Sequence, residues 1–423
     1  HIADVSEFVR EGMALDAEAL SRGNSIYLID HVVPMLPVLL SNKLCSLNEG
    51  EDRFTLSCIM EIDRRGKVQE YKICESIIKS SARLVYDDVS DFLEHGKANA
   101  KLEAHGFMLK DMQELAECLK KAREELGSID FDIDEAEFEI DKDGVPVDIS
   151  LTERRTANRL IEEFMLIANR TVAEHYFWME YPFIYRVHEK PLPEKVMELK
   201  SFLKGIGISL PLNEGNIHPL ALRNLLEEAD KDGKLSLVSA VMVRSMQKAF
   251  YSPECLGHYG LAFKQYCHFT SPIRRYADLW IHRMIKHQMH EELSDEQLSK
   301  YHERAKKVSD IVSETERKAI SMERELEKLK KAQYMKRWVG YEEQGIISGI
   351  TSFGIFVQLP NTVEGLVRFD TLTDDYYEFD QENYRLVGCN HGRQFRLGDS
   401  VKVVCTRVDT LIGAIDFRLC QKN

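Results

Sequence analysis

The sequence lacks any apolar run approaching the roughly 18 residues that span a membrane, and it has no C-x-x-C pair. Its nine cysteines, an odd number, are scattered between Cys45 and Cys420. This distribution argues against a secreted disulfide framework and against a zinc ribbon. No secretory signal precedes the first fold-like segment. We therefore expect a soluble protein of the reducing cytoplasm.

An excess of positive charge is also missing. Lys and Arg total 56 against 70 Asp and Glu, which gives a net charge of −14. A broadly basic surface that attracts phosphates from a distance is thereby excluded. Any nucleic-acid site must be a local basic channel in an acidic body.

Local patterns predict mixed strands and helices over most of the chain. Residues 1–75 are predicted to be strands and turns, with RRGK (64–67) as one turn. Helices are predicted from about Asp87, including one that ends at Gly127. A strand pair with its turn at 142–144 follows.

An amphipathic helix is predicted over 157–176. Its apolar stripe consists of Leu160, Ile161, Phe164, Ala168 and Val172, and a separate polar stripe consists of Asn158, Glu162 and Asn169. Taken alone, the polar stripe indicates a solvated face.

A capping box at Ser294 predicts the start of a long charged helix that reaches about Arg337. Its buried edge is marked by Leu326, Leu329, Met322 and Met335. After Trp338 the pattern changes to five short strands with glycine-marked corners: GIISGI, GIFVQL, EGLVRF, SVKVVCTRV and AIDFRLC. Such strands suit a small barrel of the oligonucleotide-binding type. The expected fold class is thus α+β, with a large mixed domain (1–337) and a small five-stranded OB-type β-barrel (338–423).

The run HFTSPIRRYADLWIHR, 268–283, carries the strongest chemical signal. Ser271 followed by Pro272 predicts a helix start, which places Arg274 and Arg275 in the first turn. Cations in the first turn interact unfavourably with the helix dipole, whereas a bound phosphate would interact favourably with both the dipole and the arginines. These residues therefore predict a phosphate cradle, and pairing of the arginines with carboxylates is an equal alternative.

Further along the same helix, the expected buried stripe and the expected basic patch separate. The buried stripe consists of Ile273, Ala277, Ile281 and Met284, and the basic patch is extended by His282, Arg283 and Lys286.

The same run resembles the signature of the ribonuclease II and ribonuclease R (RNB) family of exoribonucleases. Five other stretches resemble the family in the same order: HIADVSEFV (1–9), SIYLIDHVVPMLPVLLSNKLCSL (25–47), ARLVYDDV (82–89), LIEEFMLIAN (160–169) and YRVHEKP (185–191). The C-terminal barrel is similar to an S1 RNA-binding domain. The segment DDYYEFD (374–380) favours the ribonuclease R branch.

The resemblance implies a site that grips the 3′ end of single-stranded RNA. It places Tyr27 and Phe131 as the two rings that stack on terminal bases, an interaction that tolerates any sequence. Without the family, core packing is the simpler interpretation of an aromatic residue in a strand.

The resemblance also implies roles near the scissile bond. Tyr86 and Glu162 match positions close to that bond, and a carboxylate there can accept from the 2′-hydroxyl. Arg274 matches the arginine that stabilises charge on the phosphate, with Arg275 beside it. Glu323 matches a further position near the 3′ end.

In the S1-like barrel, the face that such domains offer to RNA includes Phe353, Phe356 and Arg368. Where Arg368 stands, the family often has histidine, so a phosphate contact can replace stacking. Phe353 is equally interpretable as an exposed turn residue.

The family hydrolyses phosphodiesters with a divalent metal, Mg²⁺ or Mn²⁺, held by clustered aspartates. That aspartate segment is not in this chain, and the resemblance places it upstream of His1. Asp4, Asp87 and Asp88 are too isolated to replace it, because a two-metal site needs several converging carboxylates. Either the chain is part of a longer protein, which we favour, or it is a metal-less relative.

The expected function is a processive 3′-to-5′ exoribonuclease that releases nucleoside 5′-monophosphates in RNA decay and quality control. The expected partners are single-stranded RNA and, further, the ribosome or structured RNA such as rRNA. The protein is expected to be a monomer without membrane contact. The alternatives are a catalytically inactive RNA- or ribosome-binding relative and an α/β protein with no RNA role.

Overall fold

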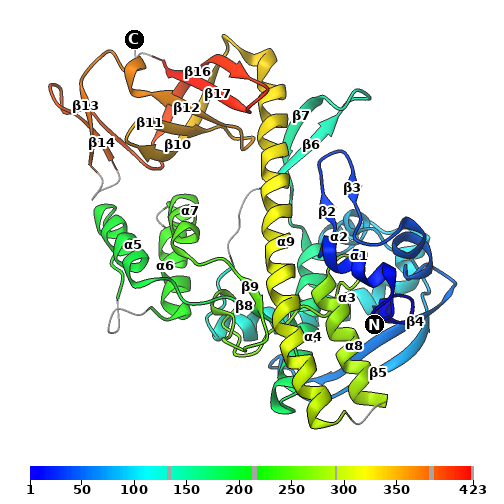
Figure 1. Cartoon of the computed structure of the whole chain (residues 1–423). Coiled ribbons are helices and arrows are strands. Elements are labelled where there is room, and N and C mark those ends of the chain that lie inside the picture. Colours follow the sequence, from blue (N-terminus) through cyan, green and yellow to red (C-terminus); the bar gives the residue numbers. More distant parts are fainter. Residues whose placement is uncertain (131–134, 212–216, 232, 291–292, 381–384, 421–423) are drawn as a thin grey trace.

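A computed structural model describes residues 1–130, 135–211, 217–231, 233–290, 293–380 and 385–420. It contains a helix-rich body and a C-terminal barrel, and the long helix α9 (Asp295–Met335) runs from one to the other (Figure 1). The mixed fold class that the sequence predicts is confirmed. Within the described ranges, no helix is both long and apolar enough to cross a membrane.

A three-stranded sheet with the order β1–β4–β5 covers one side of the body. It consists of β1 (Ile2–Ala3), β4 (Asp52–Ile62) and β5 (Val68–Lys79). The RRGK turn lies between β4 and β5, as predicted. A separate hairpin of β2 (Ile26–Tyr27) and β3 (Val32–Val33) stands beside α9 (Figure 1).

The opening segment is less β-rich than predicted. Residues Ala14–Arg22 form helix α1, Val5–Glu7 form a 3-10 turn (η1), and Leu40–Leu44 form a π-helical turn (η2). Alanine, leucine and glutamate in ALDAEALSR are strong helix formers. Gly23, at φ 69°, then ends α1.

Three helices and a hairpin form the middle of the body. They are α2 (Tyr86–His95), α3 (Ala100–Glu125), α4 (Thr156–Trp178) and the pair β6 (Ala136–Ile140) and β7 (Pro146–Leu151). The predicted turn at 142–144 is confirmed.

The polar stripe of α4 is only partly solvated, contrary to the simple interpretation. Asn158 is exposed, but Asn169 is buried. Its Oδ1 accepts from the Phe269 N–H at 2.8 Å, and its Nδ2 donates to the Tyr266 hydroxyl at 3.2 Å. Asn169 therefore ties α4 to the start of the 268–283 run.

Three further helices form a separate group: α5 (Pro193–Gly205), α6 (Pro219–Lys231) and α7 (Leu235–Ser245). They are flanked by the paired strands β8 (Tyr185–Val187) and β9 (Phe250–Ser252) and followed by the 3-10 turn η3 (Tyr259–Leu261). Figure 1 shows this group below the barrel.

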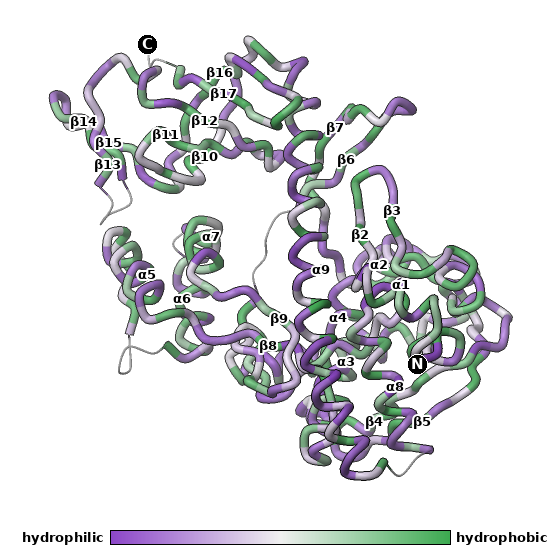
Figure 2. Tube along the Cα trace, in the orientation of Figure 1, coloured by the Kyte–Doolittle hydropathy of each residue, from purple (hydrophilic) through white to green (hydrophobic). Residues whose placement is uncertain are grey.

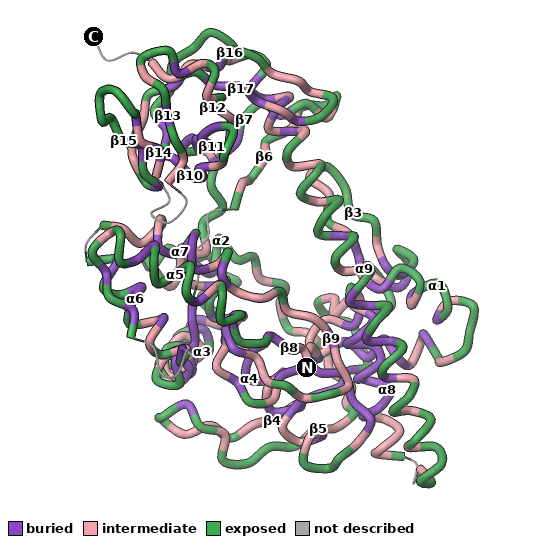
Figure 3. Tube along the Cα trace, turned by 60° about the vertical axis from the view of Figure 1, so that its left-hand side comes forward, coloured by how far each residue is buried: buried purple, intermediate pink, exposed green. Residues whose placement is uncertain are grey.

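Helix α8 (Tyr276–His290) packs in the core of the body, and α9 runs from the body to the barrel (Figure 1). The capping box at Ser294 is confirmed, with Gln297 as its partner. Hydrophilic residues dominate α9 (Figure 2), whereas α8 is largely buried (Figure 3). Met335 is buried as predicted, but Met322 is exposed.

The five predicted C-terminal strands form a closed barrel with the order β10–β11–β12–β17–β16. The strands are β10 (Glu342–Thr351), β11 (Gly354–Gln358), β12 (Glu364–Arg368), β16 (Ser400–Asp409) and β17 (Ala414–Leu419). Inserted between β12 and β16 is a small sheet, not predicted, of β13 (Tyr377–Asp380), β14 (Arg385–Gly388) and β15 (Gln394–Arg396). The 3-10 turns η4 (Lys336–Trp338) and η5 (Phe369–Thr371) flank these elements.

Two large apolar cores hold the molecule together. One surrounds Trp280, Tyr176 and Phe183 in the body. The other is shared by the α5–α7 group and the barrel. The barrel is therefore packed against α7 as well as against α9.

Candidate RNA 3′-end site

Two chain segments about 250 residues apart in sequence meet at the candidate site. The Ser25 N–H donates to the Arg274 carbonyl at 2.9 Å, and the Tyr276 N–H donates to the Gly23 carbonyl at 2.8 Å. This short antiparallel pairing brings the β2 strand next to the SPIRRY turn. It places Tyr27 and Arg274 in one pocket.

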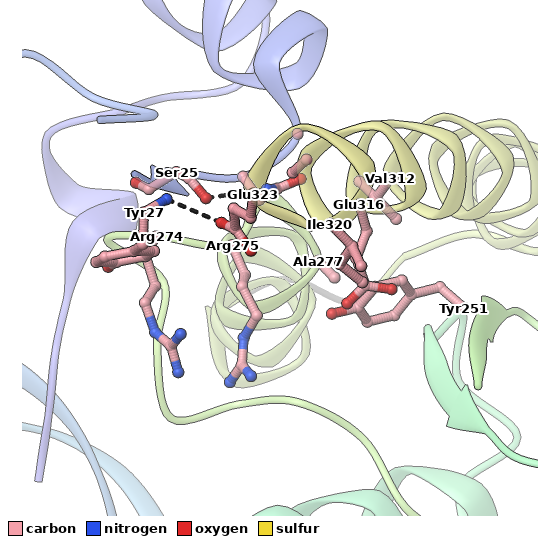
Figure 4. Close-up of a pocket in the computed structure, with 13 residues that line it drawn as sticks. Ser25, Tyr27, Tyr251, Arg274, Arg275, Ala277, Val312, Glu316, Ile320 and Glu323 are labelled. Carbon is pink, nitrogen blue, oxygen red and sulfur yellow. Dashed lines mark hydrogen bonds between the residues drawn. The ribbon is translucent and has the colours of Figure 1, made fainter. Parts of the chain in front are cut away.

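The pocket has a volume of about 200 Å³ and lies between these two segments and α9. Figure 4 shows Tyr27, Arg274 and Arg275 at one end, with Tyr251 and Glu316 at the other. Four predicted site residues meet here: Tyr27, Arg274, Arg275 and Glu323.

Arg275 is held by a buried carboxylate. Its Nε and Nη2 donate to the two oxygens of Asp278 at 2.9 and 2.8 Å. Asp278 is fully buried and also accepts from the Ser271 N–H at 2.7 Å. Complete burial raises the pKa of the Asp278 carboxyl, and Arg275 opposes the shift. For Arg275 the ion-pair alternative is therefore the one observed.

Arg274 differs from its neighbour. Its side chain is exposed, and no hydrogen bond or ion pair of its guanidinium is found among the described residues. Figure 4 shows the two guanidinium groups pointing the same way from the pocket end. A free guanidinium beside a paired one makes Arg274 the group that is available to a phosphate.

The predicted helix start at Ser271 is wrong. Residues 271–274 form a turn, in which the N–H groups of Arg274 and Arg275 donate to the Ser271 carbonyl at 3.2 and 3.0 Å. Helix α8 begins only at Tyr276. Backbone pairing to residues 23–25 and the bond from Ser271 to Asp278 hold the turn outside the helix.

Tyr27 and Glu323 are linked directly. The Tyr27 N–H donates to the Glu323 Oε1 at 2.9 Å, across 296 positions of sequence (Figure 4). The Tyr27 side chain is about half exposed. The carboxylate on α9 therefore fixes the strand while the ring stays accessible for stacking.

The predicted basic extension of this site along α8 is also wrong. His282 is fully buried, and burial lowers its pKa to about 4, so that it is neutral at pH 7. Arg283 forms a buried pair with Asp16 at 2.7 Å, and Lys286 pairs with Asp4 and Glu7, both at 2.8 Å. These groups stabilise the core instead of widening the cation surface.

Two predicted residues lie outside the pocket lining. Tyr86 begins α2 and is half exposed. Glu162, on α4, accepts from Arg154 Nη2 at 2.6 Å, and Arg154 Nη1 lies 3.3 Å from Asp130. The predicted ring Phe131 lies outside the described residues.

A second pocket of about 360 Å³ is lined by residues of α9 and of the barrel. Phe356 and Arg368 line it, and Arg368 Nε lies 3.4 Å from Asp416. Phe353 is exposed in the turn between β10 and β11, with its ring edge-on to that of Phe356 at 6.2 Å between centroids.

Sequence reasoning missed several residues of the first pocket. Glu316 lies seven residues before Glu323 on α9, so helical spacing could have identified it. Asn24 and Ser25 are close neighbours of Tyr27 in sequence. We identified no local pattern in the sequence that indicates Tyr251 as a site residue. Its hydroxyl lies 2.9 Å from His268 Nδ1.

A divalent metal does not fit the part of the chain that the structure describes. No group of three or more His, Cys, Asp or Glu side chains there is placed to hold an ion. Asp4 is paired with Lys286, and Asp87 and Asp88 are on α2, so they do not form such a group.

Comparison with protein families matches the RNB domain to residues 1–291. The chain belongs to the RNB family. The S1 RNA binding domain matches residues 338–419, which include the closed barrel. The predicted family resemblance is thus confirmed.

Named relatives agree with the RNB assignment. Ribonuclease R of Thermotoga maritima is 44% identical, over 100% of this chain and 60% of that protein. Ribonuclease R of Escherichia coli is 38% identical, over 100% of this chain and 53% of that protein. This RNB-family chain therefore spans little more than half of the length of these relatives.

A solved structure shows the same architecture. Mycoplasma genitalium RNase R in complex with ribose-methylated single-stranded RNA matches with a TM-score of 0.93 and 30% identity, over 99% of this chain and 66% of that one.

Proposed function

We propose that the protein to which this chain belongs is a processive 3′-to-5′ exoribonuclease that releases nucleoside 5′-monophosphates from single-stranded RNA. The observation that carries the proposal is that Arg274, whose guanidinium has no partner among the described residues, lies beside Tyr27 in one pocket of an RNB-family chain. The M. genitalium relative with bound single-stranded RNA supports the substrate class.

In the proposed mechanism, the chain holds the 3′ end of the substrate. The Tyr27 ring stacks on a terminal base, and the Glu323 carboxylate keeps its strand in place. Arg274 donates to the scissile phosphate and stabilises the charge that develops there. Asp278 neutralises Arg275, so that only one guanidinium is offered to the phosphate.

We assign further roles on the family resemblance. Phe131 is the second stacking ring, and Tyr86 lies near the scissile bond. Glu162 accepts from the 2′-hydroxyl, which distinguishes RNA from DNA. Phe353, Phe356 and Arg368 bind RNA on the S1 barrel.

The domain boundaries and the setting are part of the proposal. We assign residues 1–337 to the catalytic domain and 338–423 to the S1 domain. Activity depends on Mg²⁺ or Mn²⁺, whose ligands are not among the described residues. The protein acts as a cytoplasmic monomer in RNA decay and quality control, with the ribosome or structured RNA as further partners.

The direct test incubates the intact parent protein with 3′-hydroxyl single-stranded RNA and Mg²⁺. Release of nucleoside 5′-monophosphates from the 3′ end is the expected result. Arg274→Ala should retain RNA binding but slow the release by about 100-fold or more, as expected for loss of a charge-stabilising donor. Binding of the RNA without release of mononucleotides would contradict the proposal.

That same result would favour a second function, an RNA-binding relative without catalysis. In that case Arg274→Ala would weaken RNA binding without altering a reaction rate.

A further inference from the structure

A buried bridge joins α4 to the end of α3. Arg123 donates to both carboxylate oxygens of Glu163, at 2.6 and 3.3 Å, and to the Ser128 hydroxyl at 2.5 Å. All three residues are buried. Removal of either charge from such a pair leaves the other buried without compensation, which is strongly destabilising. This bridge therefore serves the stability of the fold.

A second bridge lies beside the first and is partly exposed. Arg154 Nη2 donates to Glu162 Oε2 at 2.6 Å, and its Nη1 donates to Asp130 Oδ1 at 3.3 Å. The side chains of Arg154, Glu162 and Asp130 are 31%, 41% and 42% exposed. Ion pairs that water reaches in this way contribute little to stability. The fold therefore depends much less on the second bridge than on the first.

The Glu162 carboxylate is held at one oxygen and open at the other. Its Oε2 accepts from Arg154, whereas its Oε1 accepts from no residue that the structure describes. An ionised carboxylate can accept hydrogen bonds at both of its oxygens. Glu162 can therefore accept from a hydroxyl at Oε1 while Arg154 fixes the position of the carboxylate at Oε2.

The next residue, Arg155, ties the same end of α4 to α2. Its guanidinium binds two carboxylates of α2 at 2.6 and 2.7 Å, and α2 begins at Tyr86. Arg154 in turn reaches Asp130, the residue before Phe131 in the sequence. Two adjacent arginines thus connect α4 to α2 and to the segment that precedes Phe131.

We propose that Arg154 is a positioning residue, which holds the Glu162 carboxylate for the 2′-hydroxyl of bound RNA and thereby sets the preference for ribose over deoxyribose. The inference rests on the role of Glu162 in the proposed function and adds to it the residue that aims this carboxylate. Without Arg154, the Glu162 side chain would keep its rotamer freedom, and binding of the hydroxyl would have to order it.

The test compares two strands that bind to the intact parent protein in the absence of divalent metal. One is 3′-hydroxyl single-stranded RNA, and the other is the same strand with deoxyribose in its last few nucleotides. Arg154→Ala should lower the ratio of the two affinities about tenfold, by weakening the RNA alone, as expected for loss of a hydrogen bond to a charged group. Arg154→Lys, whose ammonium can donate to one carboxylate oxygen, should restore part of the ratio.

A second substitution shows whether Arg154 acts through Glu162. Glu162→Gln should lower the affinity ratio by itself. If Arg154 acts only by aiming this carboxylate, Arg154→Ala should lower the ratio no further in the Glu162→Gln background, because the two side chains belong to one interaction.

A matched control removes a similar arginine from the same helix. Arg170 donates to Glu174 at 3.0 Å, and the two side chains are 34% and 40% exposed. Arg170→Ala should therefore leave the affinity ratio unchanged. Thermal unfolding of each variant checks that the fold is retained.

An unchanged ratio in Arg154→Ala, or equal weakening of both strands, would overturn the inference. So would a further loss in the Glu162→Gln background, or equal binding of both strands by the unaltered protein. Failure of the parent protein to release mononucleotides would contradict the proposed function, but it would not change the outcome of this binding comparison.

Discussion

Arg274 and Arg275 are adjacent, but only Arg275 has a buried carboxylate against it. Asp278 lies three residues after Arg275, a spacing at which side chains on a helix meet. This spacing in the sequence already indicates that Asp278 can neutralise Arg275. The free state of Arg274 could not be predicted, because it depends on the turn that holds residues 271–274 outside α8.

Substitution of the two arginines should change the free energy of unfolding by very different amounts. Arg275→Ala should lower the free energy of unfolding by about 3 kcal/mol or more, because it leaves Asp278 buried without its partner. Arg274→Ala should change that free energy by no more than about 0.5 kcal/mol, as for an exposed side chain. Urea unfolding of both variants measures the difference, and equal losses would contradict it.

The burial of His282 predicts that the free energy of unfolding depends on pH. Its Nε2 lies 2.8 Å from the Phe269 carbonyl, and its buried Nδ1 has no partner within the described chain. Burial lowers the pKa from 6.5 to about 4. Between these values the unfolded chain binds the proton and the folded chain does not, so stability falls as the pH falls.

From pH 7.5 to pH 5 this histidine should account for a loss of about 2 kcal/mol in the free energy of unfolding. His282→Gln, whose amide can still donate to the carbonyl, should remove that part of the pH dependence. The exposed His302, replaced in the same way, serves as the control. Identical pH profiles for His282→Gln and the unaltered chain would refute the assignment.

At the scale of elements, the barrel depends on close contact with α9. Gly413, in the turn between β16 and β17, has φ +68°, and a Cβ there would lie 3.1 Å from the backbone carbonyl carbon and oxygen of Lys328. An added methyl group would therefore push the barrel from the helix. Gly392 has a similar φ of +66° with open space around it, and it offers a matched comparison.

Gly413→Ala should destabilise the barrel more than Gly392→Ala, which carries only the backbone strain of about 1 kcal/mol. Limited proteolysis of the barrel and thermal unfolding of both variants measure the effect. If the two variants were equally stable, the contact with α9 would not support the barrel.

Sequence patterns predict a helix start or a turn correctly where residues close in sequence determine it. The capping box at Ser294 begins α9, and the turn at 142–144 joins β6 to β7. The helix start at Ser271 was wrong because a distant segment, residues 23–25, pairs with this part of the chain instead. The sheet formed by β13, β14 and β15 had no local pattern that we identified.

At the scale of the whole molecule, the chain carries a net charge of −14, and the Arg274 guanidinium has no partner among the described residues. Under the proposed function, the acidic body would repel distant RNA, whereas local contacts would hold bound RNA. Added salt screens the repulsion and also weakens the phosphate contacts. The two effects act on different steps of binding.

We therefore expect the association rate of single-stranded RNA to stay level or rise between about 50 and 200 mM salt, while the dissociation rate increases. Stopped-flow measurement with labelled RNA separates the two rates. An association rate that falls steeply with salt would instead indicate long-range attraction, contrary to this charge distribution.

The assembly of the site was beyond what spacing in the sequence can predict. Tyr27 and Glu323 meet across 296 positions, and only the packing of the β2–β3 hairpin against α9 brings them together. The family resemblance named both residues without specifying their hydrogen bond. The same resemblance did not reveal that α9 lines two pockets.

Helix α9 continues unbroken from Asp295 to Met335. The α9 side chains that line one pocket therefore point in a fixed direction relative to those that line the other. One residue inserted after Glu323 would turn the barrel-side residues by about 100° away from the first pocket, whereas seven would restore the direction to within about 20°. The unbroken helix therefore fixes the direction of the side chains at one pocket relative to those at the other.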